Sequence, residues 1–473
     1  MEINTLLQKF EEEKITSIDL KFVDLNGELR KVTISKDIFN EKIVEKGVGF
    51  DGSSVTGFRK VSAGDLVLIP DLESFYIEPF SETKVASFFC FIKEADTREQ
   101  FPDDPRYLAK KVSKVLIKSK VADEILFAPE FEFYIFSKAE YDIKDNYSFF
   151  FVDTEEGYWN SGEIEEGAYL PIEQGKGYHK ALPLDRYFDL REEIVSMMRT
   201  LDIQFKYHHH EVGSPSQHEI EVPLTEMFKS AENSVLIKYI VKNVARKYNL
   251  LATFMPKPLP SDSGSGLHCH IQLKKNGRNV LYNKRNYGNL SEVALNFIGG
   301  ILHHGRSLCA FTNPSVNSFK RLVPGFEAPT KLFFSIGNRS AAIRIPKYAN
   351  SEDDLRFEFR TPDGTCNPFF AFPAIVMAGF DGIKKKINPT KMGYGPFNMN
   401  VFDLKEKERN KIKSIPESFE EALNCLESDN KYLVEDGVFS EHLVDAYITT
   451  KRREIESFKK SIDPLEFRLY FNC

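Results

Sequence analysis

Two glutamates stand two positions apart in an apolar stretch, residues 127–136. The aromatic and β-branched residues around them predict a strand. Side chains two positions apart on a strand share a face, so Glu130 and Glu132 point the same way, with their Cα atoms roughly 6–7 Å apart. Two carboxylates that close repel by about 2–3 kcal/mol at an effective dielectric near 20. Hard divalent cations bind carboxylate oxygens and would reverse this repulsion. The alternative is a strand whose glutamates simply point into water.

Histidine and glutamate are concentrated in a second stretch. Residues 208–221 contain four histidines and three glutamates. In an extended chain Glu219 and Glu221 share a face. These residue types predict either a metal cluster or a charged hairpin.

A run of glycine and serine, residues 261–266, leads into a predicted strand that carries His268 and His270 on one face. Glycine lets a ligand approach the backbone closely. The sequence has no Walker A pattern and no GxGxxG before a helix, which argues against P-loop and Rossmann sites. Earlier in the chain, Asp51 lies among turn-forming residues, in either an ordinary loop or a binding loop.

Arginine is concentrated between residues 320 and 363, where a predicted strand places Arg356, Glu358 and Arg360 on one face. Arginine recognises carboxylate and phosphate groups through paired hydrogen bonds. The segment therefore suits a polyanionic ligand, or else it forms salt bridges within the chain. Its arginines and carboxylates are Arg321, Arg339, Arg344, Arg356, Arg360, Glu327 and Glu358.

A mixed set of helices and strands must position these groups. A helix at 5–13 and strands at 17–24, 30–34, 66–70 and 84–93 are predicted before a polar segment at 95–106. Asp104 and Pro105 make a favourable helix start, so we predict a boundary between domains 1–102 and 103–473. Residues 137–183, which are polar and Gly-rich, predict a surface insertion or loop. Further helices are predicted at 186–201, 226–248, 367–386 and 440–460.

The composition is that of an ordinary globular protein. The 473 residues are 42% hydrophobic and 28% charged, and the net charge of −7 suggests no nucleic-acid or membrane partner. The N-terminus does not look like a signal peptide, and no apolar run reaches the roughly 18 residues that a membrane span needs. Six scattered cysteines without a CxxC pair indicate reduced thiols and a cytoplasmic protein.

Taken together, the motifs resemble those of class I (bacterial-type) glutamine synthetases along nearly the whole chain. The resemblance is carried by Asp51–Ser54, the Glu130/Glu132 strand, and residues 209–212, 217–220, 254–258, 264–270, 317–329, 338–346 and 357–367. It implies an α+β protein with a small N-terminal β-grasp domain and a larger catalytic domain, which has a curved antiparallel sheet and surrounding helices. It also implies a homo-oligomer of two stacked hexameric rings, a dodecamer, with active sites between subunits.

The resemblance implies ATP-dependent ligation of ammonia to L-glutamate through a γ-glutamyl phosphate, with two Mg²⁺ or Mn²⁺ ions in each site. Glu132, Glu211 and Glu219 match the ligands of one ion, and Glu130, His268 and Glu358 match those of the other. Charge neutralisation by two ions suits transfer of a phosphoryl group.

Substrate contacts follow from the same resemblance. Arg321, Arg360 and Gly264 match the glutamate site, and Asp51, Ser54, Tyr178 and Glu211 match the ammonium pocket. Glu327 matches a flap residue that shields the acyl phosphate. Arg339 and Arg344 match the phosphate-binding arginines, and His270, Gln272 and Arg356 match the nucleotide side. Asp51, Glu327 and Arg339 are the expected catalytic residues.

The chain departs from the family pattern at several positions. Ser263 replaces a usual Asn in the glutamate loop, and Lys206, Gln272 and Asp353 differ near the nucleotide. The segment 177–180 differs from the usual Gly-Tyr-Phe-Pro because His179 and Lys180 follow Tyr178. Phe402 stands where adenylylated members have tyrosine, which predicts no adenylylation.

Two other interpretations remain open from the sequence. One is a γ-glutamyl-amine ligase that uses a polyamine or similar amine, which the Ser263 departure permits. The other is a non-catalytic structural or regulatory relative, against which the presence of all six matched metal ligands argues.

Overall fold

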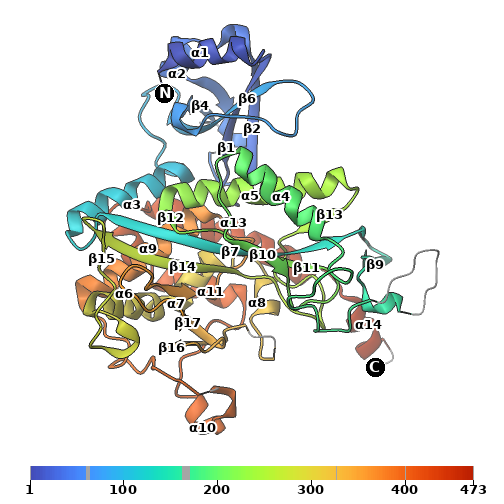
Figure 1. Ribbon diagram of the computed structural model, residues 1–473, viewed down its shortest axis with the longest axis vertical. Helices are drawn as coiled ribbons and strands as arrows, with labels where there is room; N and C mark the ends of the chain where they lie inside the picture. The colour runs from blue at the N-terminus through green and yellow to red at the C-terminus, as the bar shows by residue number, and fades with distance from the viewer. Residues whose placement is uncertain (1, 60–63, 162–170, 326–327, 400, 472–473) are drawn as a thin grey trace.

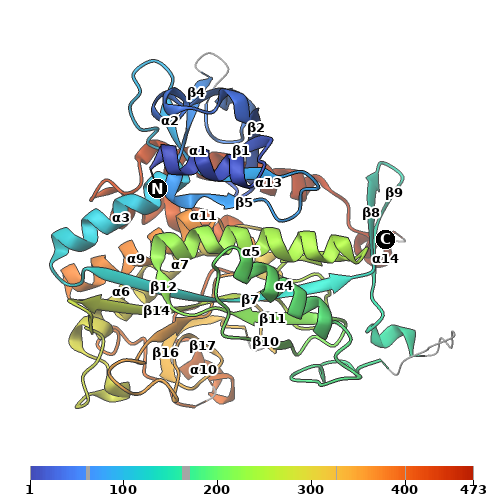
Figure 2. The same ribbon diagram turned by 45° about the horizontal axis from the view of Figure 1, so that its top comes forward.

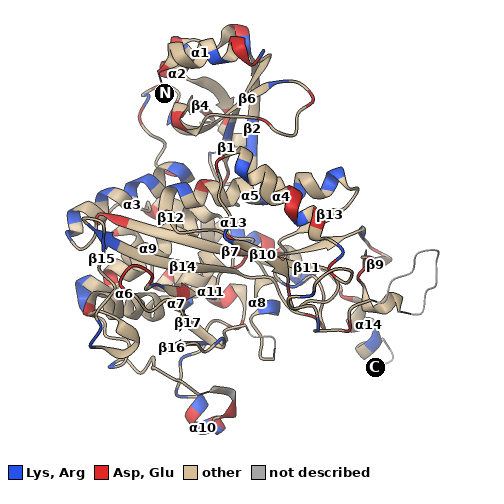
Figure 3. Cartoon of the chain, in the orientation of Figure 1, with Lys and Arg blue, Asp and Glu red and all other residues tan. Residues whose placement is uncertain are grey.

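The computed structural model describes residues 2–59, 64–161, 171–325, 328–399 and 401–471. Figure 1 shows a small N-terminal domain above a larger one, with the C-terminus beside the larger domain. None of the helices in these described ranges is long and apolar enough to cross a membrane. Acidic and basic residues are interspersed over most outer elements, apart from the lysine-rich helix α3 (Pro105–Ser119) (Figure 3).

The small domain is a six-stranded sheet with the order β2-β1-β6-β4-β3, and β5 pairs with β6. Strands β1 and β6 are parallel and the other pairs are antiparallel. Helix α1 buries Leu6 and Phe10, one turn apart, in the same core as Phe88 of β6. The elements are α1 (Ile3–Glu12), β1 (Ser17–Val23), β2 (Leu29–Ser35), α2 (Glu41–Lys46), β3 (Val48–Asp51), β4 (Asp65–Pro70), β5 (Tyr76–Ile77) and β6 (Val85–Glu94).

The large domain is built on a ten-stranded sheet with the order β10-β11-β7-β14-β18-β17-β16, to which β12, β13 and β15 add short pairings. All pairs are antiparallel except β16 with β17. The strands are β7 (Glu124–Phe136), β10 (Tyr207–His210), β11 (Gln217–Glu221), β12 (Thr225–Glu226), β13 (Leu251–Thr253), β14 (Leu267–Lys275), β15 (Arg278–Asn279), β16 (Lys331–Ile336), β17 (Ala341–Ile345) and β18 (Phe357–Phe359).

Helices cover one face of this sheet. Phe127, Phe131 and Phe133 of β7 are buried in the same cluster as residues of α3, α5 and α9, so the opposite face is left for Glu130 and Glu132. The helices are α4 (Phe188–Thr200), α5 (Met227–Lys247), α6 (Glu292–His303), α7 (Gly305–Thr312), α8 (Ser318–Arg321), α9 (Pro368–Lys385), α10 (Glu406–Arg409), α11 (Phe419–Ser428), α12 (Lys431–Val434), α13 (Glu441–Lys460) and α14 (Pro464–Tyr470).

The segment after β7 is not simply irregular chain. It begins with an antiparallel hairpin, β8 (Lys138–Lys144) and β9 (Tyr147–Asp153). The aromatic run at residues 149–151 is a strand signal that the prediction of an insertion or loop at 137–183 did not use. The hairpin lies beside α14 near the C-terminus (Figure 2), where Ser148 Oγ donates to Ile462 O at 3.4 Å.

A buried arginine joins the small domain to helix α5. Arg106, at the start of α3, is 1% exposed and donates to Asp71 at 2.9 Å and to Glu232 of α5 through Nε at 3.1 Å. Its guanidinium also lies 4.3 Å from the ring centre of Phe91. Burial opposes its charge, but the two carboxylates outweigh this and raise the pKa of Arg106.

We expect Arg106→Met to destabilise the protein by about 3–5 kcal/mol, because the buried Glu232 would lose its buried, hydrogen-bonded partner. The measurement is denaturant unfolding followed by fluorescence. Lys229→Met is the matched control, since Lys229 reaches the same Glu232 at 3.6 Å from a half-exposed position and should contribute under about 1 kcal/mol. Equal losses of unfolding free energy in the two variants would contradict a special role for the buried Arg106–Glu232 pair.

Candidate functional site

A cavity of about 750 Å³ opens on the sheet face that the helices leave uncovered. Its walls come from β7, β10, β11, β14, β17 and β18 and from the loops that follow them. Twelve of the eighteen residues that the resemblance assigns to the site line it: Glu130, Glu132, Tyr178, Glu211, Glu219, Gly264, His268, Arg321, Arg339, Arg344, Glu358 and Arg360.

One group of possible metal ligands in this cavity joins three strands. His268 lies opposite Glu130 in the β14–β7 register, and β18 places Glu358 beside them. His268 Nδ1 is 2.9 Å from a Glu130 oxygen and 3.8 Å from a Glu358 oxygen. All three side chains are buried, and one potential ligand atom of each lies within 4.8 Å of the others. Two carboxylates and an imidazole at this spacing could hold a divalent cation.

A second group of possible metal ligands lies one strand away from the first. His209, Glu211 and Glu219 offer ligand atoms within 4.8 Å of one another. Glu219 stands directly opposite Glu132 in the β11–β7 register, but the Glu132 carboxylate turns to accept a hydrogen bond from Gly266 N at 2.7 Å. The structure therefore groups two members of the set Glu132, Glu211 and Glu219 with His209, which the sequence analysis did not assign. The histidine-rich stretch was the signal for it.

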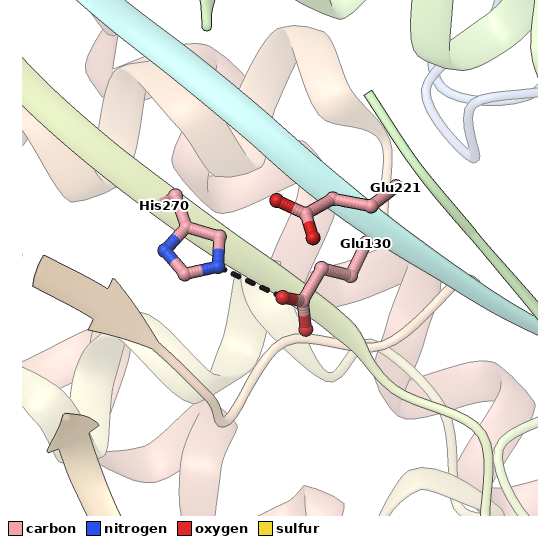
Figure 4. A group of neighbouring side chains, drawn as sticks. All are labelled: Glu130, Glu221 and His270. Atoms are coloured by element: carbon pink, nitrogen blue, oxygen red, sulfur yellow. Dashed lines mark hydrogen bonds and ion pairs between the residues drawn. The ribbon is translucent and has the colours of Figure 1, made fainter. Parts of the chain in front are cut away.

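A third group of possible metal ligands, Glu130, Glu221 and His270, was not predicted from the sequence. Figure 4 shows Glu221 and Glu130, on neighbouring strands, close to the imidazole of His270. His270 Nε2 lies 2.8 Å from Glu130, and Lys206 donates to Glu221 at 2.7 Å. His270 Nδ1 and one Glu221 oxygen are buried with no hydrogen-bond partner among the described protein atoms. His270 is thus tied to the same carboxylate as His268.

The protein neutralises these carboxylates unevenly. Burial opposes the charge of Glu130, but His270 and His268 outweigh it and lower the pKa of Glu130. Burial likewise opposes the charge of Glu358, and Arg360 leads the groups that lower its pKa. In contrast, burial and then Glu132 raise the pKa of Glu211 to about 7. Burial and then Glu130 raise the pKa of Glu219 well above its usual range. Glu211 and Glu219 therefore have less compensating positive charge around them than Glu130 and Glu358.

Three arginines flank the carboxylates. Arg344 donates to Glu358 at 2.6 Å, and Arg360 also donates to Glu358, while Arg360 Nε donates to Arg339 O at 3.1 Å. Arg321 is 4% exposed and donates to the backbone oxygens of Thr361 and Arg360 at 2.8 and 3.1 Å. A guanidinium anchored on neutral carbonyls keeps its charge available for an anionic ligand.

The glycine-containing loop is held close to Arg321. Gly264 O accepts from Gln217 Nε2 at 3.0 Å, and Tyr134 donates to Ser263 O at 2.6 Å. A Cβ atom on Gly264 would lie 2.7 Å from both Pro256 O and Arg321 Cγ. Because nothing larger than glycine fits, the backbone of this loop forms part of the cavity wall.

The remaining residues of interest lie elsewhere. Asp51 is exposed on the small domain, where its carboxylate accepts from Ser53 N at 2.8 Å and Ser54 Oγ at 2.7 Å, and neither Asp51 nor Ser54 lines the cavity of its own chain. Arg356 lies 5.6 Å from the ring centre of Tyr348. Gln272 donates to the backbone oxygens of residues 353 and 355 at 2.8 and 3.1 Å. Glu327 and the side chain of Phe402 lie outside the described part of the chain.

Comparison with known proteins identifies the family. Residues 102–470 match the family described as "Glutamine synthetase, catalytic domain", and residues 14–95 match "Glutamine synthetase, beta-Grasp domain". The chain belongs to the glutamine synthetase family. Both the resemblance predicted from the sequence and the α+β architecture with an N-terminal β-grasp domain are confirmed.

Other members of the glutamine synthetase family match this chain over almost its full length. Proteins named glutamine synthetase from Frankia alni and Aquifex aeolicus are 40% and 42% identical over 471 residues, covering 99% and 100% of this chain and 98% of each relative. The structure of Plasmodium falciparum glutamine synthetase aligns with a TM-score of 0.89 at 28% identity, covering 99% of both chains. A structure titled "Apo GmaS without ligand" aligns with a TM-score of 0.79 at 26% identity, again over 99% of both chains.

We expect Mn²⁺ to raise the thermal midpoint of the protein because it relieves repulsion among buried carboxylates. Glu219→Gln should reduce this rise, whereas Glu124→Gln, at the far end of the same face of β7, should leave it unchanged. An equal response of both variants to Mn²⁺ would contradict the assignment.

The rise in thermal midpoint caused by Mn²⁺ should depend on pH. The pKa of Glu211 is raised on folding to about 7. Its protonated form therefore stabilises the folded, metal-free protein at low pH, and this stabilisation is lost as pH rises through about 7. Metal binding requires the deprotonated form. The shift in thermal midpoint caused by Mn²⁺ should therefore be larger at pH 8 than at pH 6, and a shift independent of pH would contradict this.

Proposed function

We propose that the protein is a glutamate–ammonia ligase: the terminal phosphoryl group of ATP is transferred to L-glutamate, giving ADP and γ-glutamyl phosphate, and ammonia then displaces the phosphate to give L-glutamine. The observation that carries this proposal is that clustered carboxylates and buried arginines line the same cavity. Full-length similarity to proteins named glutamine synthetase supports it.

The donor set fits two divalent cations. We assign Glu130, His268 and Glu358 to one ion, and Glu211 and Glu219, with Glu132 or His209, to the other. Carboxylate oxygens with one imidazole suit Mg²⁺ or Mn²⁺. Bound there, the ions would neutralise charge on the phosphoryl oxygens of ATP.

We assign the anionic substrates to the arginines. Arg321 and Arg360, with the backbone at Gly264, would hold L-glutamate at the cavity wall. Arg339 and Arg344 would contact the phosphates and stabilise charge that develops during transfer. We place the nucleotide on the side of His270, Gln272 and Arg356.

The ammonium pocket would combine Tyr178 and Glu211 with Asp51 and Ser54 of a neighbouring subunit. An anionic pocket attracts ammonium, and the Asp51 carboxylate would help to remove a proton from it. Glu327 would shield the acyl phosphate from water. The position of Asp51 outside the cavity of its own chain supports a site that is shared between subunits.

We further propose a cytoplasmic dodecamer, with the domain boundary near residue 102. Support for assembly comes from apolar side chains that are exposed on the β8–β9 hairpin and on α14. Phe150, Ile143, Phe467 and Tyr470 are 65%, 70%, 57% and 62% exposed. Aromatic and aliphatic groups gathered in this way commonly mark an interface.

A γ-glutamyl-amine ligase is the second candidate, which the Ser263 departure permits but which the full-length similarity to proteins named glutamine synthetase does not favour. The deciding experiment measures ADP release from ATP and glutamate with Mg²⁺, and compares ammonium with methylamine, putrescine and hydroxylamine. We expect turnover with ammonium. Turnover with an alkylamine but not with ammonium would establish the second candidate. The absence of ADP release with every acceptor would favour a non-catalytic relative.

Arg321→Met should raise the KM for glutamate by about 10- to 100-fold, since a charged hydrogen bond to substrate is lost. The KM for ATP should change far less. Glu327→Ala should abolish net synthesis with ammonium. An unchanged glutamate KM in Arg321→Met would remove Arg321 from the glutamate site.

Phe150→Asp should shift the assembly toward smaller species, because it places a charge on the exposed apolar hairpin. Sedimentation velocity at several protein concentrations measures this. Ile117→Asp, at a 65% exposed position on α3, is the control and should sediment like the unmodified protein. Identical sedimentation of Phe150→Asp and the unmodified protein would exclude the hairpin from the assembly.

A further inference from the structure

The turn that carries Tyr178 is bound to the end of strand β10. Gly177 N donates to Val212 O at 3.2 Å, and His179 N donates to His210 O at 3.0 Å. A Cβ atom on Gly177 would lie 2.3 Å from Glu211 O. The turn backbone therefore runs in direct contact with the strand end that supplies Glu211, and its position is set by backbone hydrogen bonds.

His179 joins two other rings at the mouth of the cavity. Its ring centre lies 4.1 Å from that of Tyr178, nearly parallel at 19°, and 4.3 Å from that of His209. Tyr178 and His209 are 5.4 Å apart and edge-on at 75°. His179 thus contacts both rings more closely than they approach each other, and it fills the space between Tyr178 and β10.

Tyr178 connects this cluster to the phosphate-binding side. The guanidinium of Arg339 lies 5.7 Å from the Tyr178 ring centre, within the range of a cation–π interaction. Tyr178 is itself 42% exposed. The contacts with the His179 ring and with the Arg339 guanidinium therefore help to fix where the half-exposed phenol lies.

We propose that His179 is a positioning residue that sets acceptor size. Its imidazole holds Tyr178 against Arg339 and keeps the acceptor pocket narrow enough to favour ammonia over alkylamines. This inference rests on the proposed function, and it assigns to one residue the discrimination between ammonia and larger amines.

The backbone at His179 allows the ring to be tested separately from the turn. His179 has φ of +54°, in the left-handed region. Asparagine tolerates this conformation better than most residues but has no aromatic ring. Phenylalanine keeps a planar ring at the same place. His179→Asn therefore removes the stack while retaining the turn, and His179→Phe retains the stack.

The experiment measures kcat and KM for ammonium and for methylamine, with ATP and glutamate saturating. In His179→Asn we expect kcat/KM for ammonium to fall by about three- to tenfold, the range of one aromatic pair. The loss should appear in the KM for the amine, and methylamine should lose less or gain. His179→Phe should restore the ratio of the unmodified protein. Lys180→Asn, the next position in the same turn, is the matched control and should leave the ratio unchanged.

Three outcomes would overturn the inference in distinguishable ways. If the unmodified protein does not use ammonium, the proposed function fails and the inference falls with it. If the unmodified protein does use ammonium but His179→Asn keeps its acceptor ratio, only the inference fails. If His179→Asn shows low kcat with every acceptor and an unchanged ratio, the ring is merely structural. Should His179→Asn not fold, His179→Gly accepts the same φ and is judged by the same ratio.

Discussion

The repulsion among carboxylates buried on one face of a β-sheet is the constraint on which this structure depends. Glu130, Glu132 and Glu219 are each 7–8% exposed and come from two adjacent strands. Buried like charges are costly unless cations are nearby or protons are retained. The structure uses both solutions: histidine and arginine surround Glu130 and Glu358, whereas Glu211 and Glu219 hold their protons more tightly. Glu211 and Glu219 are therefore acidic groups that could hold a divalent cation.

The same sheet explains how charge can be concentrated without loss of the fold. Alternation along β7 separates the glutamates from Phe131 and Phe133, which pack into the core on the helical side. The hydrophobic face stabilises the strand in its register. A one-residue slip would bury the glutamates in the core and expose the aromatic rings, so the apolar face fixes the position of the polar one.

Rigid support comes from outside the cavity. Helix α5 packs on β7 and is tied to the small domain through Arg106 and Glu232 and through the hydrogen bond from Tyr239 to Glu78 at 2.9 Å. The small domain carries Asp51 on its exposed surface, away from the cavity of its own chain. An active site that needs Asp51 together with the cavity would therefore require a second copy of the chain. The exposed aromatic hairpin is the surface that we propose for this association.

Strand periodicity and motif order could be interpreted from the sequence alone. They predicted the face shared by Glu130 and Glu132, the strand carrying His268 and His270, the helix that begins after Asp104, and the family. Local periodicity suffices for these because neighbouring side chains on a strand or helix have fixed relative directions. The β8–β9 hairpin was missed because its aromatic run lies in a polar, Gly-rich segment.

Only the tertiary structure decided which of these residues meet. His209 joins Glu211 and Glu219, Glu221 approaches His270, and His179 reaches His209 because separate strands and turns come together at one sheet face. These distances depend on register between segments that are far apart in the sequence; Glu130 and His270, for example, are 140 residues apart. No local pattern encodes that register, since it follows from how the whole hydrophobic core packs.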